Sequence, residues 1–199
     1  MKRPPREELV ARFAPGRSFL DVGAMWSVHG AIAFAARDAG ATRVTALDVM
    51  APTPELLERQ GDVRFVQGDV HDPGVTMPHD VVWCSGVLYH APNPVLTLQR
   101  LRELTTELLI LQTMTLPELP GVKQGLVFYP GVPNPSLYAR WGDQAARSLR
   151  LPEPGEDPYA PWWWGISHSA LDAMLRAANF EPVESWGDPF AVHLTARPV

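Results

Sequence analysis

Short apolar runs alternate with polar and glycine-containing breaks from residue 17 to about residue 113. Five of these runs are too short for an independent helix and are bounded by turn residues. This pattern is typical of strands that are buried on both faces of a parallel sheet. The predicted strands are residues 18–22, 43–47, 63–66, 80–84 and 107–112.

The longer segments between and after these runs carry helix signals. Thr53, Asn93 and Ser167 are residue types that cap helix N-termini, and a proline follows both Thr53 and Asn93. Gly40 and Asn179 suit the left-handed position at which helices end. The sequence therefore predicts helices at residues 29–39, 54–60, 95–104 and 167–178.

Residues 115–165 interrupt this regularity. Nine of the 21 prolines lie between residues 116 and 161, and no helix or strand period is sustained there. The aromatic side chains of this segment need a surface to pack on, which argues against simple disorder. We therefore expect an insertion that covers a binding site as a lid.

Only Gly187, Asp188 and Pro189 separate two further predicted strands, residues 181–186 and 190–196. A connection this short joins antiparallel neighbours. The expected fold is α/β, with a mostly parallel sheet that closes with a C-terminal antiparallel hairpin. Residues 1–199 are predicted to form one domain.

The amino-acid composition excludes several classes of binding partner and site. The 17 basic and 22 acidic residues give a net charge of −5, so nucleic acid is a poor default partner. The lone Cys84 excludes an intrachain disulfide framework and a multi-cysteine metal site, and no other spacing of ligands predicts a metal. No apolar run is long enough to span a membrane, so a cytoplasmic protein is expected.

Acidic residues follow three of the predicted strands. Asp21 precedes Gly23 at the end of the first strand, Asp48 ends the second, and Asp69 follows the third. The glycine pattern that binds a dinucleotide pyrophosphate is absent after Gly23, which favours a nucleoside without a pyrophosphate. Asp48 is placed to accept hydrogen bonds from a ribose diol, and Asp69 from an adenine amino group.

Four segments, FLDVGA, VTALDV, VQGDV and HDVVWCSGVLYHAPNP, resemble the successive motifs of class I S-adenosylmethionine-dependent methyltransferases. The resemblance covers nearly the whole chain. It implies a Rossmann-like fold with a seven-stranded sheet, methyltransferase activity and S-adenosyl-L-methionine as the cofactor. It also implies cofactor contacts at Asp21, Gly23, Ala24 and Met25 near the methionine moiety, at Asp48, Val49 and Met50 near the ribose, at Gly68, Asp69 and Val70 near the adenine, and at Ser85 and Gly86 under the transferable methyl group.

The sequence says less about which residues contact the methyl acceptor than about those that contact the cofactor. The usual glycines of the first motif are replaced by residues 25–29, so Trp26 and His29 become candidate substrate contacts or packing residues. His90 is the candidate general base, with the alternative that it only shapes the pocket. Further candidate substrate contacts are Tyr89, Tyr129, Trp162 and Trp164, with packing as the alternative for the two tryptophans. Arg140, Arg147 and Arg150 could bind a substrate carboxylate, although such arginines are more often simply solvated.

The segment Ser85 to Pro92 is similar to the small-molecule methyltransferases called type 11, and more loosely to tRNA wobble-uridine modifying enzymes. The leading hypothesis is transfer of a methyl group to a small, aromatic or otherwise planar metabolite, with oxygen, nitrogen and carbon acceptors all open. The alternatives are a non-catalytic S-adenosylmethionine-binding module and a tRNA-modifying enzyme. The acidic balance counts against the tRNA-modifying enzyme.

Overall fold

The computed structural model describes residues 4–26, 28–131, 148–157 and 159–199. Its centre is a seven-stranded sheet with the order β3-β2-β1-β4-β5-β9-β8. Strands β3 to β5 run parallel, β9 runs antiparallel to β5, and β8 runs antiparallel to β9, as the sequence predicts. The strands are β1 Ser18–Val22, β2 Arg43–Asp48, β3 Arg64–Gln67, β4 His79–Ser85, β5 Thr105–Met114, β8 Phe180–Asp188 and β9 Ala191–Pro198.

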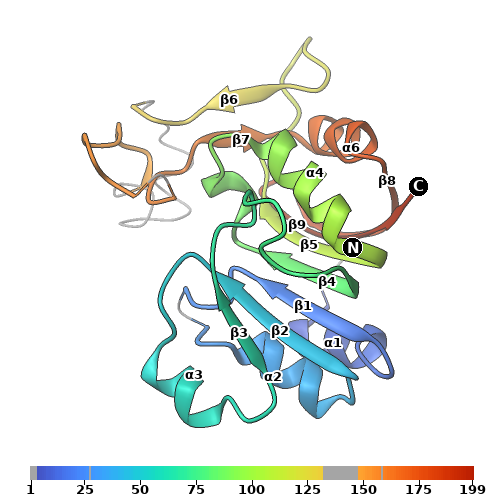
Figure 1. The fold of residues 1–199 in the computed structure, drawn as a ribbon. Helices are drawn as coiled ribbons and strands as arrows, with labels where there is room; N and C mark the ends of the chain where they lie inside the picture. Colours follow the sequence, from blue (N-terminus) through green and yellow to red (C-terminus); the bar gives the residue numbers. More distant parts are fainter. Residues whose placement is uncertain (1–3, 27, 132–147, 158) are drawn as a thin grey trace.

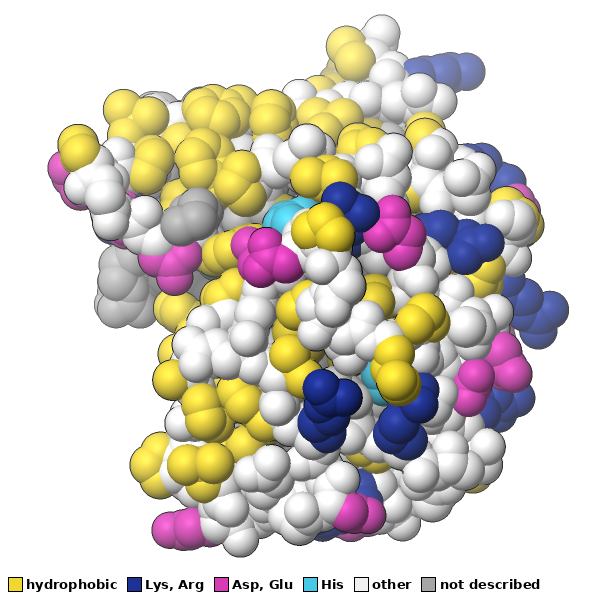
Figure 2. Space-filling model, in the orientation of Figure 1, with side chains coloured by type: hydrophobic (Ala, Val, Ile, Leu, Met, Phe, Trp, Pro, Cys, Tyr) yellow, Lys and Arg dark blue, Asp and Glu magenta, His cyan; other side chains and the backbone are white. Residues whose placement is uncertain are grey.

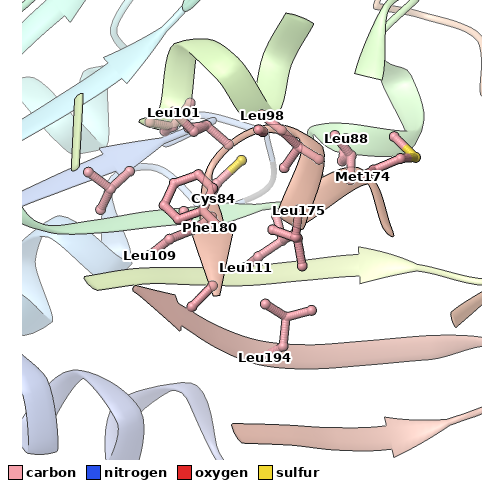
Figure 3. Close-up of a cluster of buried hydrophobic side chains, with 14 of the residues drawn as sticks. Cys84, Leu88, Leu98, Leu101, Leu109, Leu111, Met174, Leu175, Phe180 and Leu194 are labelled. Carbon is pink, nitrogen blue, oxygen red and sulfur yellow. The ribbon is translucent and has the colours of Figure 1, made fainter. Parts of the chain in front are cut away.

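Helices cover both faces of the sheet (Figure 1). On one face lie α1 Arg6–Phe13, α2 Ala31–Asp38 and α3 Pro54–Arg59, and on the other lie α4 Pro94–Leu104 and α6 His168–Ala177. Each face buries its own apolar cluster. Figure 3 shows the cluster under α4 and α6, where Leu98 and Leu101 meet Leu175 and Phe180 around the fully buried Cys84. The prediction of an α/β sheet closed by an antiparallel hairpin is confirmed.

Single capping residues mark where several of the helices begin and end. The side chains of Thr53, Asn93 and Ser167 each accept a hydrogen bond from a backbone N–H in the first turn of the helix that follows. Asn179 has a φ of 61°, the left-handed conformation expected after α6. These local predictions hold because a cap is decided within one turn of chain.

One helix begins later than predicted. Residue 29 is not helical, because His29 and Gly30 have φ values of 47° and 78°, and α2 begins at Ala31. Gly30, in the left-handed conformation, is the N-cap residue of this helix. Predicted helix 29–39 is therefore wrong at its first two residues.

Some short elements have no counterpart in the sequence prediction. They are α1, the 3₁₀ turn Leu88–His90, and a separate pair of antiparallel strands, β6 Leu126–Phe128 and β7 Trp164–Ile166. The two short strands pair across most of the irregular segment, and three residues are too few to show a periodicity. None of the helices in the described ranges is both long and apolar enough to cross a membrane.

The contribution of the Asn93 cap to stability can be tested by substitution. In an Asn93→Ala variant the side-chain oxygen that accepts from the Leu96 N–H at 3.1 Å is lost. We expect the free energy of unfolding to fall by about 0.5–2 kcal/mol, as for other cap deletions. Chemical denaturation measures this, with Gln99→Ala as the control at an exposed position of the same helix. An equal or larger loss in the control would contradict the capping role.

Candidate active site

A cavity of about 430 Å³ lies at the carboxyl ends of β1, β2, β3 and β4. Its size is within the usual range for small-molecule sites, about 300–1,000 Å³. Because these strands are parallel, their carboxyl ends share one edge of the sheet, where α/β folds bind ligands. Figure 2 shows hydrophobic side chains gathered on the side of the molecule toward which β1 and β2 run in Figure 1.

Most of the predicted cofactor residues line this cavity. The lining set is Asp21, Gly23, Asp48, Val49, Met50, Gly68, Asp69, Val70, Ser85 and Gly86. Ala24 and Met25 do not reach the cavity, because both side chains are buried in the core under α2. Met25 acts through its backbone, whose N–H donates to Asp48 Oδ2 at 2.7 Å.

Asp21 is a buried carboxyl group on the cavity wall. Its Oδ2 has no hydrogen-bond partner among the described residues. Burial raises the pKa of Asp21 to about 7; the Ala33 N–H and Arg6 oppose this rise, and the nearby Asp48 adds to it. A buried oxygen without a partner is costly, so this position favours a ligand that brings a hydrogen-bond donor.

Asp48 has a different environment at the end of β2. Its Oδ2 accepts from the Met25 N–H, and its Oδ1 accepts from the Met50 N–H at 2.8 Å. Burial raises the pKa of this carboxyl group, and the backbone N–H groups lower it. These N–H groups are those of Met50, Met25 and Val49, and a carboxylate offers about four acceptor positions, so Asp48 keeps acceptor capacity for a ligand.

Asp69 bonds to two groups that the sequence analysis did not connect with it. The Tyr159 hydroxyl donates to Asp69 Oδ2 at 2.6 Å, and the His71 N–H donates to Asp69 Oδ1 at 2.8 Å. The His71 ring also lies with Nδ1 2.9 Å from Asp69 Oδ1. Tyr159 belongs to the irregular segment and lines the cavity, so the insertion reaches the site at this point.

His90 lies in a cluster of aromatic side chains. Its ring centroid is 4.6 Å from that of Tyr89, 6.4 Å from that of Trp162 and 6.5 Å from that of Trp26. His90 Nδ1 lies 3.0 Å from the Pro161 carbonyl oxygen, which only accepts, so Nδ1 carries a proton. In the neutral ring the lone pair is therefore on Nε2.

The pKa of His90 is lowered by burial, while the Pro161 and Tyr159 carbonyl groups and Asp157 act in the opposite direction. Burial also raises the pKa of Tyr89 to about 12. Both side chains line the cavity, as does Trp26, which is 66% exposed at its mouth. The structure thus brings together a neutral imidazole and aromatic surfaces at the predicted acceptor side.

Several predicted acceptor residues do not line the cavity. His29 lies on the surface, with Nδ1 3.8 Å from Glu55 Oε2. Tyr129 and Trp162 are buried in a small apolar cluster with Leu116 and Leu149. Trp162 is one layer behind the cavity, since its ring meets Tyr89 edge-on.

Trp164 also lies away from the cavity, because its Nε1 donates to the Pro92 carbonyl at 3.0 Å and its ring packs against Phe128. Arg150 forms an ion pair with Glu156 rather than facing the cavity. Arg140 and Arg147 lie outside the described residues.

The cavity has further lining residues that sequence reasoning missed: Arg6, Val22, Val28, Ile32, Leu47, Trp83, Val87, Asp157 and Tyr159. Arg6 reaches the wall from α1, where its Nε donates to Gln112 Oε1 at 2.9 Å. The Ser85 hydroxyl donates to the same oxygen at 3.0 Å. No periodic signal marks α1, which buries only Leu9 and Val10, so Arg6 had no detectable signal.

The family model described as Methyltransferase domain matches residues 20–107. A search of curated proteins found no significant match. Among solved structures, the chain is similar to 1,6-didemethyltoxoflavin-N1-methyltransferase of Burkholderia thailandensis, bound to its named substrate and S-adenosylhomocysteine. The TM-score is 0.67 and the identity 21%, over 98% of this chain and 77% of that one.

Two other structures have the same fold. One is magnesium protoporphyrin IX methyltransferase of Synechocystis PCC 6803 with S-adenosylhomocysteine, with a TM-score of 0.64 and 16% identity over 98% of this chain and 82% of that one. The other is the cyclase SpnF, with a TM-score of 0.63 and 16% identity over 96% and 79%. This chain therefore shares its overall fold with these three structures.

Proposed function

We propose that this chain is a class I S-adenosylmethionine-dependent methyltransferase and that it transfers a methyl group to a small planar or aromatic acceptor, as the methyltransferase-domain match and the fold support. The observation that carries the proposal is one cavity that joins three strand-end carboxyl groups to an aromatic wall around His90. The carboxyl groups suit the cofactor. The aromatic wall suits a flat acceptor.

The residues present fit S-adenosylmethionine. The unpartnered Oδ2 of Asp21 would accept from the ammonium group of the methionine moiety. The remaining acceptor capacity of Asp48 would serve the ribose hydroxyls, and Asp69 would accept from the adenine amino group. When bound, the cofactor supplies a methyl group on a positively charged sulfur.

Three side chains form the acceptor side of the proposed site. Trp26, Tyr89 and His90 present ring surfaces to the cavity. Aromatic faces bind planar molecules by stacking, and they attract cations. The first two similar structures act on flat conjugated molecules according to their names, which supports the same acceptor class here.

Methyl transfer needs close alignment of the acceptor atom with the methyl group, and in this proposal the walls of the cavity would provide it. An acceptor that carries a proton must also lose it. The Nδ1–H bond to Pro161 leaves the Nε2 lone pair of His90 as the basic position. We assign His90 the role of general base, with the proton transferred from the acceptor to Nε2.

Titration calorimetry with S-adenosylmethionine and S-adenosylhomocysteine tests the proposal, followed by a methyl-transfer screen over planar hydroxy, amino and carbon acceptors. Binding of both ligands and turnover of a planar acceptor is the expected result. Binding without any turnover would favour a non-catalytic module or another reaction on this fold, such as that of the cyclase SpnF. No binding would refute the cofactor assignment.

The pH dependence of cofactor binding tests Asp21 separately. With a pKa of about 7, Asp21 is largely protonated below neutral pH in the empty protein, and pairing with an ammonium group requires the carboxylate. We expect the Kd for S-adenosylhomocysteine to rise up to about tenfold for each pH unit below 7, and to level off above it. Calorimetry from pH 5.5 to 8 measures this slope. The same slope in Asp21→Asn would assign it to another group.

A further inference from the structure

Tyr159 lies in the insertion. Its hydroxyl donates a hydrogen bond to Asp69, the carboxylate proposed to bind the adenine, which lies 90 positions earlier in the chain. Burial and the bond to Asp69 both raise the pKa of Tyr159, so its hydroxyl keeps its proton and donates. We propose that Tyr159 is a positioning residue that links recognition of the adenine amino group to the placement of His90 on the acceptor side. This inference rests on the proposed function.

The acceptor positions of Asp69 support this link. Oδ2 accepts from Tyr159, and Oδ1 faces both the backbone N–H and the ring Nδ1 of His71. Of about four acceptor positions, these two hydrogen bonds use one on each oxygen, and the remaining position on Oδ2 lies beside the Tyr159 hydroxyl. An adenine amino group that donates to this position would share Oδ2 with Tyr159. The nucleoside and the insertion would therefore meet at one atom.

His71 fixes the orientation of this pair. Its Nε2 lies 2.8 Å from the Thr97 hydroxyl of α4, and its Nδ1 lies 2.9 Å from the Tyr159 hydroxyl. The rings of His71 and Tyr159 are nearly parallel, with an interplanar angle of 7°. Tyr159 is thus held by the loop after β3 and, through His71, by α4.

The residues just after Tyr159 hold the acceptor side. The Pro161 carbonyl accepts from His90 Nδ1, and the Trp163 N–H donates to the Tyr89 carbonyl at 2.8 Å. The five-residue stretch 159–163 therefore has one end on Asp69 and the other on the turn that carries Tyr89 and His90. Because the stretch is short, displacement of Tyr159 would move the groups that orient His90.

The test compares Tyr159→Phe with Tyr129→Phe, which also removes a hydroxyl from the insertion but does so outside the cavity. Hydrogen exchange at the Trp163 amide and calorimetry are measured with and without S-adenosylhomocysteine. In the wild type we expect the ligand to slow this exchange at least tenfold. Tyr159→Phe should lose that protection and weaken the Kd three- to tenfold, while Tyr129→Phe should match the wild type.

Acceptor kinetics and a second ligand complete the test. Tyr159→Phe should raise the KM of the acceptor and lower kcat together, since His90 is misplaced. S-inosylhomocysteine, which presents an oxygen in place of the amino group, should give the wild type no protection at Trp163. Normal ligand protection in Tyr159→Phe would overturn this inference alone, whereas failure of the wild type to bind S-adenosylhomocysteine would overturn the proposed function as well.

Discussion

Replacement of His90 with Gln is expected to lower kcat by about 10²- to 10⁴-fold, the usual range for a positioned acid or base. Gln cannot take a proton at neutral pH, although it preserves much of the volume of the ring. The affinity for S-adenosylmethionine should stay near that of the wild type, because Asp21, Asp48 and Asp69 are unchanged. Initial rates at saturating cofactor, measured with an acceptor that loses a proton, test this expectation.

The pH profile distinguishes a base from a residue that only shapes the pocket. Burial lowers the pKa of His90 below its ordinary value of 6.5, and the base is active when the ring is neutral. Wild-type turnover should therefore rise with pH through a pKa below 6.5 and be level above it, provided that methyl transfer is rate-limiting. In His90→Gln this rise should be absent.

His29→Gln is the matched control, because its ring lies on the surface beside Glu55 and does not line the cavity. It should keep both the rate and the pH profile of the wild type. If His90→Gln shows the wild-type pH profile with only a modest loss of rate, alignment of the acceptor is the main catalytic device, and His90 is not the base.

Asp48→Ala is expected to weaken cofactor binding by about 10²- to 10⁴-fold. Two hydrogen bonds from the ribose diol to a charged acceptor contribute about 1.5–3 kcal/mol each, and each 1.4 kcal/mol is about tenfold in Kd. The substitution also leaves the Met25 and Met50 N–H groups without their acceptor. Calorimetry with S-adenosylhomocysteine measures the loss, and thermal unfolding shows whether the variant is folded.

Two other variants separate binding from local structure. Asp48→Asn keeps one acceptor oxygen and should be less impaired in both measurements. Asp69→Ala should weaken cofactor binding less than Asp48→Ala, because a single adenine contact is lost. An unchanged Kd in folded Asp48→Ala would remove this residue from the ribose site, and a larger loss in Asp69→Ala would reverse the two assignments.

The sequence by itself determined the sheet, four of its helices and the edge at which the cavity lies. Buried parallel strands are continuous apolar runs, and the caps at Thr53, Asn93 and Ser167 act within one turn, so both signals are local. Asp21, Asp48 and Asp69 each follow a strand, and parallel strands end at one edge. Their convergence on one cavity follows from topology alone.

Only the tertiary structure decided which part of the insertion reaches the cavity. Tyr159 meets Asp69 and Arg6 reaches the cavity wall, whereas Tyr129 and Trp162 turn into a buried cluster behind it. These contacts join residues far apart in the chain, within segments too short or too rich in proline to show a periodicity. In such a segment the local sequence is the same whether an aromatic residue packs against a core or faces a ligand. The neighbours that it meets in space decide between the two.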